Sequence, residues 1–307
     1  MTELTIFTPT YNRAHLLPNL YKSLCNQTNK NFIWLIIDDG SIDKTKNLIQ
    51  SWINDAIISI QYLYQNNSGK HIAHNKAVDM CTTDLFVCVD SDDILTSNAV
   101  EIIINYWKKD KDTKPNFVAY CSRRGDLSGN PTGKRWINDQ RNISFFDLYE
   151  KHKYRGELVL IWITKILKQY HFPEFKNEKF VTENVLYYQI SYKKPIKLIN
   201  DIFYLFEYKP DGYTKQGDIL YYKNPYGYAV YRYQVGILSK NLIKKIRWLA
   251  RYKGWIKAFN LNINLLNKTI KDISPIDFSI FIKIISTLYS NYYKTKYIKK
   301  KIFINYR

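Results

Sequence analysis

The chain has 307 residues, of which 46% are apolar and 16% aromatic, so it can bury a substantial core and is not an intrinsically disordered protein. Its formal net charge is +19, and the excess is concentrated at one end: residues 239–307 hold 16 Lys/Arg against 2 Asp/Glu, whereas residues 1–238 hold 30 against 25. We therefore expect a globular protein with a basic C-terminal appendage that binds an anionic surface.

Four cysteines, Cys25, Cys81, Cys88 and Cys121, form no C-x-x-C pair and have no His partner at metal-ligand spacing. This pattern is typical of reduced thiols in a cytosolic environment. The apolar run 4–8 is too short for a signal peptide, and no apolar run of 18 residues follows it. We expect no membrane-spanning segment.

The first 121 residues alternate short β-rich runs with helical patterns, which is typical of a parallel sheet with crossover helices. Strands are predicted at residues 4–8, 32–37, 57–63, 85–89 and 117–121. Helices are predicted at about 16–25, 43–53, 70–81 and 96–108, with Ser41 or Asp43 capping the second and Thr96 or Ser97 the last. The predicted fold class is α/β.

The rest of the chain is less regular. Residues 123–133 are rich in Gly, Pro and charge and predict a loop, and 144–208 mix short strands and helices, including a helical pattern at 182–193. From about residue 236 the pattern is one of basic helices. We expect three parts, with boundaries near residues 122 and 235.

Polar clusters follow three of the predicted strands. They are Thr8-Pro9-Thr10-Tyr11-Asn12, Asp38-Asp39-Gly40-Ser41 and Asp90-Ser91-Asp92-Asp93. Ligands of open α/β sheets bind beyond the carboxyl ends of the strands. These three ends therefore form the candidate site.

Asp90, Asp92 and Asp93 place at least two carboxylates at one strand end, where they repel one another unless a cation lies between them. Hard oxygen ligands suit Mg²⁺ or Mn²⁺, which would share its remaining positions with waters and diphosphate oxygens. The alternative is a capped turn before the helix at 96.

Four segments, taken in order and with their spacing, resemble the family 2 glycosyltransferases of GT-A fold, including bacterial capsule and exopolysaccharide enzymes. The segments are residues 8–13, 37–41, 69–75 and 90–93, and the resemblance covers about the first 110 residues. It implies a Rossmann-like, mixed, mostly parallel sheet flanked by helices. It also implies a nucleotide-sugar-binding half (1–122), an acceptor-binding half (123–235) and a basic helical extension (236–307).

The resemblance assigns the first two strand ends to the nucleoside. Pro9 and Tyr11 lie in the loop that packs beside the nucleobase. Asp39 is the acid that hydrogen-bonds the uracil ring and ribose, with Asp38 as the alternative, because successive strand residues point to opposite sides.

The resemblance assigns Lys70, His71 and Asn75 to the diphosphate, because amide dipoles and a cation at a helix N-terminus can hold one. The alternative is an exposed helix start with solvated polar groups.

In the acidic run, the resemblance makes Asp92 the metal ligand and Asp93 an alternative ligand. Asp90 contacts ribose or water around the metal, and Ser91 lies between them in the donor site. The metal neutralises the charge that builds on the departing diphosphate.

Inverting transfer also needs a carboxylate that takes the proton from the acceptor hydroxyl. The resemblance places Glu183 where family members have the catalytic Asp or Glu. The alternative is a structural role, because the helix dipole alone favours an acidic residue in the first turn of a helix. Glu157, beside Gly156, is the runner-up and a candidate acceptor contact.

The basic extension shows an amphipathic pattern with Trp248 and Trp255, typical of a helix that lies in a membrane interface. Its apolar positions are Leu242, Ile246, Leu249, Ile256 and Phe259, and its basic positions are Lys240, Lys244, Arg247 and Arg251. A second apolar stretch, 276–288, precedes a run of lysines. The alternative is a helical subdomain packed on the core or on a second copy. Nucleic acid is not expected, since no recognised binding motif accompanies the charge.

Together these observations predict a metal-dependent inverting glycosyltransferase, peripheral on the inner face of the plasma membrane. It would move a sugar from a UDP-sugar to a hydroxyl of a surface glycan or lipid-linked oligosaccharide. One alternative, a sugar-1-phosphate nucleotidyltransferase, needs a Gly-rich phosphate loop, and residues 5–13 contain no glycine. The other is a non-catalytic membrane-associated homologue.

Overall fold

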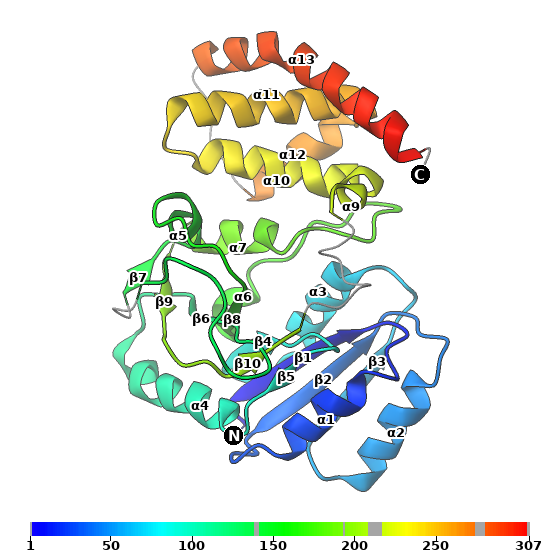
Figure 1. Cartoon of the computed structure of the whole chain (residues 1–307), viewed down its shortest axis with the longest axis vertical. Coiled ribbons are helices and arrows are strands. Elements are labelled where there is room, and N and C mark those ends of the chain that lie inside the picture. Colours follow the sequence, from blue (N-terminus) through cyan, green and yellow to red (C-terminus); the bar gives the residue numbers. More distant parts are fainter. Residues whose placement is uncertain (1, 138–140, 193, 208–216, 274–279, 306–307) are drawn as a thin grey trace. The chain divides into compact units, whose positions relative to one another are not determined.

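A computed structural model describes residues 2–137, 141–192, 194–207, 217–273 and 280–305. The chain forms two compact units (Figure 1). The first comprises residues 1–171 and 190–209, and the second comprises 172–189 and 210–307. The functional boundaries expected near residues 122 and 235 stay a prediction.

The first unit is built on an eight-stranded sheet of order β3-β2-β1-β4-β8-β6-β9-β7. Its strands are β1 (Leu4–Thr10), β2 (Phe32–Asp38), β3 (Ile60–Tyr64), β4 (Leu85–Cys88), β6 (Ala119–Arg123), β7 (Asn142–Ile143), β8 (Leu158–Ile163) and β9 (Ile196–Leu198). Strands β3, β2, β1 and β4 run parallel, and β8 runs antiparallel to both β4 and β6. The predicted α/β class, with a mixed and mostly parallel sheet, is confirmed.

A small second sheet pairs β5 (Ile94–Leu95) with β10 (Tyr204–Leu205) in antiparallel register. It lies directly after the acidic run 90–93. Because β10 comes from a segment more than a hundred residues further along the chain, this pairing brings a distant residue, Tyr204, to the acidic loop.

Helices of the first unit are α1 (Leu17–Cys25), α2 (Thr45–Asp55), α3 (Lys70–Met80), α4 (Ala99–Asp110), α5 (Phe145–Glu150) and α6 (Thr164–Leu167), with a 3₁₀ turn at Lys111–Thr113. The N-cap positions of α2 and α4 are Lys44 and Asn98, so the caps predicted for α4 were wrong. At α2, the predicted Asp43 lies one residue before the N-cap, and its carboxylate accepts from the Thr45 amide at 3.0 Å. Ser41 is instead bonded to the backbone amide of Asn12, and the Thr96 hydroxyl is bonded to the Asn98 side chain.

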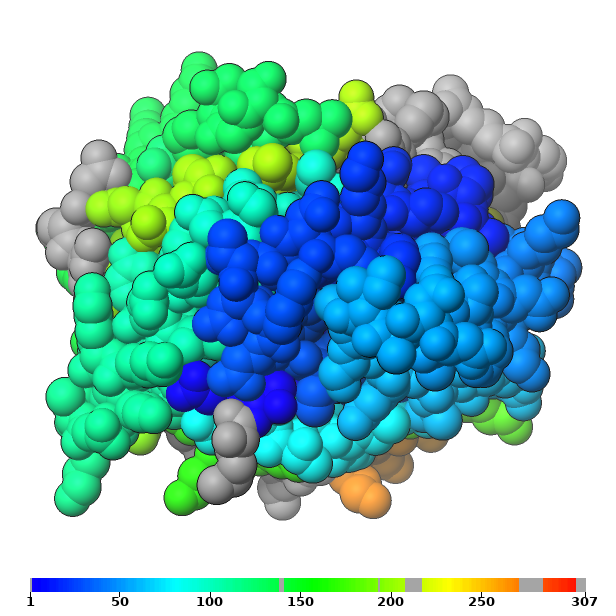
Figure 2. All heavy atoms as spheres, turned by 90° about the horizontal axis from the view of Figure 1, so that it is seen from below, coloured from blue at the N-terminus to red at the C-terminus, as the bar shows by residue number. Residues whose placement is uncertain are grey.

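Helices α1, α2 and α4 pack against one face of the sheet, and they form much of the surface seen in Figure 2. On that face Ile6 and Trp34 pack with helix residues such as Leu20, because alternate strand residues share a face. On the other face, the His74 ring of α3 packs edge-on against Phe7 and Phe86. Burial lowers the pKa of His74 to about 3, so His74 is a neutral core residue.

The second unit is helical. It contains most of α7 (Asn184–Ser191), together with α9 (Asp218–Lys223), α10 (Pro225–Leu238), α11 (Leu242–Phe259), α12 (Ile263–Ile273) and α13 (Ile280–Asn305). Within it α11 lies between α10 and α13 (Figure 1). In the described part of the chain, no helix has the length and hydrophobicity required to cross a bilayer.

The position expected for Trp255, at a membrane interface, was wrong. Its side chain is fully buried, and its indole nitrogen donates to the Pro225 carbonyl at 2.9 Å. The Arg232 guanidinium lies 4.7 Å from its ring and 4.6 Å from that of Tyr297. Helix α11 is therefore the packed centre of the helical unit, which was the alternative for this segment.

Candidate active site

The loops after β1 and β2 are fixed to each other. The Asn12 amide donates to the Ser41 hydroxyl at 2.8 Å, and the Ile42 amide donates to the Asn12 side chain at 2.9 Å. Beside them, Pro9 is half-buried at the end of β1 and the Tyr11 side chain is 47% exposed. Tyr11 thus presents an open aromatic surface on a rigid turn, which suits stacking against a flat ring.

Asp38 is fully buried at the end of β2. Its carboxylate accepts a bond from the Ser41 amide at 2.8 Å and from the Tyr62 hydroxyl at 2.9 Å. Both oxygens therefore have partners within the protein, and the residue holds the turn that follows β2.

Asp39 is also buried, but it faces a different loop. Its carboxylate accepts from the Gln65 side chain at 2.6 Å, from the Ser68 amide at 2.7 Å and from the Gly69 amide at 2.8 Å. It therefore ties the end of β2 to the loop that enters α3.

Helix α3 brings its first residue to the acidic loop. The Lys70 ammonium donates to the Asp90 carboxylate at 2.6 Å. His71 and Asn75 lie on the same helix and are 2% and 5% exposed, so they are not the solvated polar groups of an exposed helix start.

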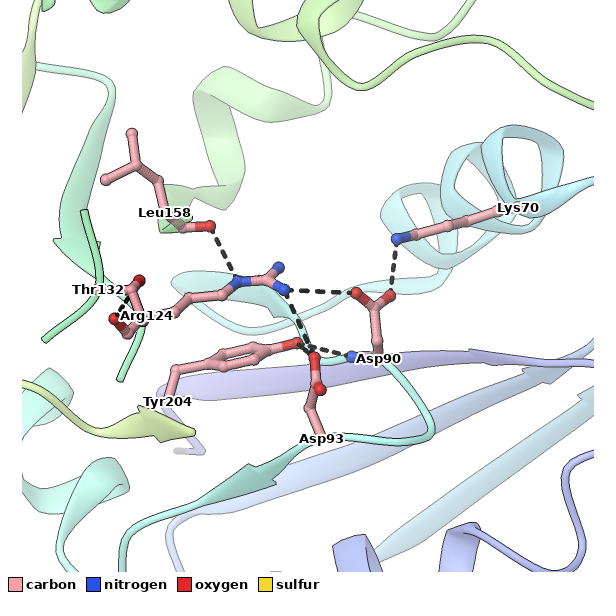
Figure 3. Close-up of polar contacts among 7 residues, drawn as sticks. All are labelled: Lys70, Asp90, Asp93, Arg124, Thr132, Leu158 and Tyr204. Carbon is pink, nitrogen blue, oxygen red and sulfur yellow. Dashed lines mark hydrogen bonds and ion pairs between the residues drawn. The ribbon is translucent and has the colours of Figure 1, made fainter. Parts of the chain in front are cut away.

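Arg124 links the two outer acids of the run (Figure 3). It directly follows β6, and its guanidinium lies 3.6 Å from the Asp90 carboxylate and 3.4 Å from that of Asp93. Its Nε donates to the Leu158 carbonyl at 3.0 Å, and its guanidinium carbon lies 4.1 Å from the centre of the Tyr204 ring. These contacts fix the guanidinium between the two carboxylates.

Tyr204 completes the cluster from β10. Its hydroxyl donates to the Asp93 carboxylate at 2.7 Å and accepts from the Asp90 amide at 3.0 Å (Figure 3). One phenol therefore holds both ends of the acidic run, and the pairing of β5 with β10 places it there.

The two outer acids have different charge states. Burial would raise the pKa of Asp90, but the charges of Lys70 and Arg124 outweigh burial and hold that pKa below its usual value. Burial and the neighbouring Asp90 raise the pKa of Asp93 to about 7. The cluster thus holds one firmly ionised carboxylate beside one that is partly protonated near neutral pH.

Asp92 lies between them and differs from both. It is half-buried, and within the described ranges its carboxylate takes part in none of the ion pairs that hold Asp90 and Asp93. Ser91 is 7% exposed.

The described residues contain no cluster of three or more His, Cys, Asp or Glu that could hold a metal ion. Mg²⁺ and Mn²⁺ sites of one or two carboxylates completed by phosphate oxygens need no such cluster, so Asp92 fits this donor set.

Glu157 lies beside this cluster, directly before β8. Its carbonyl accepts from the Arg124 amide at 3.0 Å and from the Tyr154 hydroxyl at 3.1 Å. Its negative charge is also one of those that raise the pKa of Arg124 against the effect of burial. The candidate acceptor contact is therefore close to the acidic loop.

Glu183 belongs to the second unit, where it is half-buried directly before α7. The segment leading to it is held by α10 and the residue before that helix. The Glu178 carboxylate accepts from the amides of Tyr226 and Gly227 at 2.6 and 2.8 Å. The Asn224 side chain accepts from the amides of residues 179 and 180 at 2.8 and 3.1 Å.

Gly227 allows this close approach. A Cβ at this position would lie 2.9 Å from the Val181 side chain and 3.1 Å from the Phe180 carbonyl, which is closer than atoms normally pack. The residues that precede Glu183 therefore rest directly on the backbone of α10.

The structure brings Lys70, Asp90 and Asp93 together, with Glu157 nearby. Arg124 and Tyr204 were missed by the sequence analysis. Arg124 lies three residues beyond the strand predicted at 117–121, in the Gly- and Pro-rich segment predicted as a loop, and its closeness to a strand end was a usable signal. Tyr204 is one of 27 tyrosines, and nothing local distinguishes it.

These acids and cations lie beyond the carboxyl ends of parallel strands, where open α/β proteins bind their ligands. The sequence model of glycosyl transferase family 2 matches residues 5–172, more than half of the chain. The chain belongs to glycosyl transferase family 2 and is a glycosyltransferase, as the resemblance predicted.

Two relatives extend the similarity beyond the matched region. An uncharacterized glycosyltransferase of Haemophilus influenzae is 24% identical over 263 residues, which cover 84% of this chain and 98% of the relative. A GalNAc(5)-diNAcBac-PP-undecaprenol beta-1,3-glucosyltransferase of Campylobacter jejuni is 27% identical over 218 residues, which cover 70% of this chain and 68% of the relative.

Solved structures show the same fold. TarS of S. aureus in complex with UDP-GlcNAc superposes with a TM-score of 0.60 at 16% identity, covering 98% of this chain and 90% of that one. The mannosyltransferase PcManGT of Pyrobaculum calidifontis, in complex with GDP-Man and Mn²⁺, gives a TM-score of 0.54 at 13% identity, covering 98% and 85%. The predicted GT-A fold with a basic helical extension is confirmed.

Arg124→Met should destabilise the first unit, because it leaves Asp90 and Asp93 facing each other without the shared cation. We expect a loss of about 2–4 kcal/mol in the free energy of unfolding, with a smaller loss for Arg124→Lys, which keeps the charge but not the planar fork. Urea unfolding followed by tryptophan fluorescence measures both. Adding Asp93→Asn should cost less in the Arg124→Met background than in the wild type, and equal costs would contradict the coupling.

Glu178→Ala should loosen the segment before Glu183, because two backbone amides lose their buried acceptor. The expected cost is about 1–3 kcal/mol, with Glu178→Gln intermediate because it retains one acceptor oxygen. Thermal unfolding of the wild type, Glu178→Gln and Glu178→Ala should give melting temperatures that fall in that order. A wild-type melting temperature for Glu178→Ala would contradict this prediction.

The same residue predicts a pH dependence. Burial raises the pKa of Glu178 from 4.5 to about 7, although the two amides partly oppose that rise. Between these values the folded protein holds a proton that the unfolded chain has released, so the stability due to Glu178 falls as the pH rises through this window. The stability of the wild type relative to Glu178→Gln should therefore fall between about pH 4.5 and 7, and a difference that is constant with pH would contradict the shifted pKa.

Proposed function

We propose that this glycosyltransferase moves a sugar from a UDP-sugar to a hydroxyl of a surface glycan or lipid-linked oligosaccharide. The observation that carries the proposal is the cluster at the sheet edge, where Lys70 and Arg124 supply positive charge beside Asp90, Asp92 and Asp93. The name of the Campylobacter jejuni relative describes transfer to an undecaprenol-linked glycan, and TarS has been solved with UDP-GlcNAc.

In this proposal the nucleoside binds at the first two strand ends. The loop of Pro9 and Tyr11 packs beside the base, and Asp39 hydrogen-bonds the uracil ring and ribose. Oδ1 of Asp39 already accepts bonds from Gln65 and Ser68, whereas Oδ2 accepts only from the Gly69 amide and keeps a second lone pair for a ligand. Asp38 is fully buried and bonded to Ser41 and Tyr62, which favours a supporting role.

The diphosphate binds across the start of α3 and the acidic loop. Lys70 is the direct cation, and His71 and Asn75 shape the helix end behind it. Mn²⁺ or Mg²⁺, held by Asp92 with Asp93 as the alternative ligand, would neutralise charge on the departing diphosphate. The engagement of Asp93 by Tyr204 and Arg124 favours Asp92 as the ligand. Asp90 and Ser91 border the ribose.

Glu183 takes the proton from the acceptor hydroxyl, and Glu157 contacts the acceptor. A single displacement of this kind attacks the anomeric carbon from the side opposite the diphosphate and inverts its configuration. The clamp of Glu178 and Asn224 on the preceding segment supports the role of Glu183, because a catalytic base must be held in place. The enzyme would work at the inner face of the plasma membrane, where lipid-linked acceptors are accessible.

A thermal-shift panel tests the donor site. UDP with Mn²⁺ should stabilise the wild type more than GDP or dTDP does, because a ligand that binds only the folded state raises stability with its affinity. Asp92→Asn should abolish the metal-dependent part, whereas Asp112→Asn, an exposed acid on the 3₁₀ turn, should behave as the wild type. If no nucleotide shifts the melting temperature of folded protein, the proposed donor site is wrong.

Glu183→Gln should lower kcat by roughly 100-fold or more while donor binding is retained, because only proton transfer is removed. Glu157→Gln should instead raise the KM for the acceptor. Steady-state kinetics measures both, and the anomeric coupling constant of the product by NMR should report inversion. A Glu183→Gln enzyme with wild-type kcat, or a product of retained configuration, would reject this mechanism.

A further inference from the structure

One side of α13 exposes a row of large apolar side chains. They are Ile284, Leu288, Tyr289 and Tyr292, with exposed fractions of 55%, 72%, 60% and 64%. Ile284, Leu288 and Tyr292 recur every fourth residue, so they lie on one side of the helix. The exposed lysines Lys296 and Lys299 continue the same side toward the C-terminus. We call these six residues the α13 face.

The opposite side of α13 is fixed to α11. The Lys253 ammonium donates to the Thr287 hydroxyl at 2.6 Å, and that of Lys257 donates to the Ser290 hydroxyl at 2.9 Å. A Cβ at Gly254 would lie 2.6 Å from the Tyr293 side chain, so the two helices pack at close range. The rotation of α13 is therefore set, and its apolar row is turned away from α11.

The layers of the helical unit place α13 at the outside. Helices α10, α11 and α13 lie in that order, with α13 outermost (Figure 1). Large apolar residues gathered on one outer surface are costly to leave in water, and such patches mark a contact surface.

The charge pattern selects the partner. Neither α11 nor α13 contains an Asp or Glu, and residues 239–307 hold 16 Lys/Arg against 2 Asp/Glu. A second copy would bring the same face, lysines included, without acids to oppose them. An anionic lipid surface supplies both the apolar boundary and the negative charge, and snorkelling lysines suit that boundary.

We propose that the α13 face docks this enzyme on anionic membranes. Ile284, Leu288 and Tyr292 enter the boundary between headgroups and acyl chains, and Lys296 and Lys299 bind the lipid phosphates. The proposal deepens the peripheral membrane location in the proposed function and moves it from α11, whose Trp255 is buried, to α13.

Vesicle sedimentation of the full chain tests the proposal. The wild type should bind phosphatidylcholine vesicles that contain phosphatidylglycerol, more weakly as salt is raised, and should bind pure phosphatidylcholine poorly. Ile284→Ser/Leu288→Ser/Tyr292→Ser and Lys296→Gln/Lys299→Gln should each weaken binding about tenfold or more. Lys44→Gln/Lys46→Gln removes the same charge from exposed positions at the start of α2 and should bind as the wild type does.

Three outcomes would overturn the proposal. One is equal binding by the wild type and both α13 variants. Another is an equal loss in the Lys44→Gln/Lys46→Gln control, which would make net charge the cause. The third is a wild-type dimer, seen by light scattering, that Leu288→Ser makes monomeric, because a second copy would then occupy the face. The assay needs no donor, so a failed nucleotide panel would reject the donor site and leave this result standing.

Discussion

The shape of the acidic loop after β4 depends on the position of one guanidinium, that of Arg124. Asp90 and Asp93 lie within one short loop after β4, where burial and the charge of Asp90 both oppose the ionisation of Asp93. Arg124 lies between them and Lys70 neutralises Asp90 from the other side. The loop can therefore keep its shape before any ligand binds, and Asp92 is left outside these ion pairs.

That guanidinium is itself held by long-range packing. The Leu158 carbonyl of β8 accepts its Nε–H, and the Tyr204 ring of β10 lies against its plane. Strand β8 runs antiparallel between β4 and β6, so the carbonyl that orients Arg124 comes from the strand that joins the two halves of the sheet. The antiparallel strand β8 thus positions the Arg124 guanidinium and also joins β4 to β6 in the sheet.

Local patterns allowed the first half of the fold to be predicted. The strands at 4–8 and 32–37 are runs of mostly buried apolar residues, and the polar clusters that follow them lie at the carboxyl edge of the sheet, where ligands of such sheets bind. Tyr204 could not be found this way, because its role comes from pairing with Leu95, a contact that no local period encodes. The predicted location of Trp255 was wrong for a related reason. Helical spacing shows which residues share a face of the helix, but it does not show whether lipid or protein covers that face.

The two carboxylates expected to act on the acceptor are supported in different ways. Glu157 precedes a central strand and adjoins Arg124, so its position follows from the sheet. Glu183 precedes a short helix in the other unit, and its preceding segment is fixed by single polar side chains, Glu178 and Asn224, on backbone amides. Each such bond contributes little, but several buried acceptors on one segment leave it few alternative conformations. The proposed base is therefore positioned by hydrogen bonds to a helix start, whereas the proposed acceptor contact is positioned by a strand of the sheet.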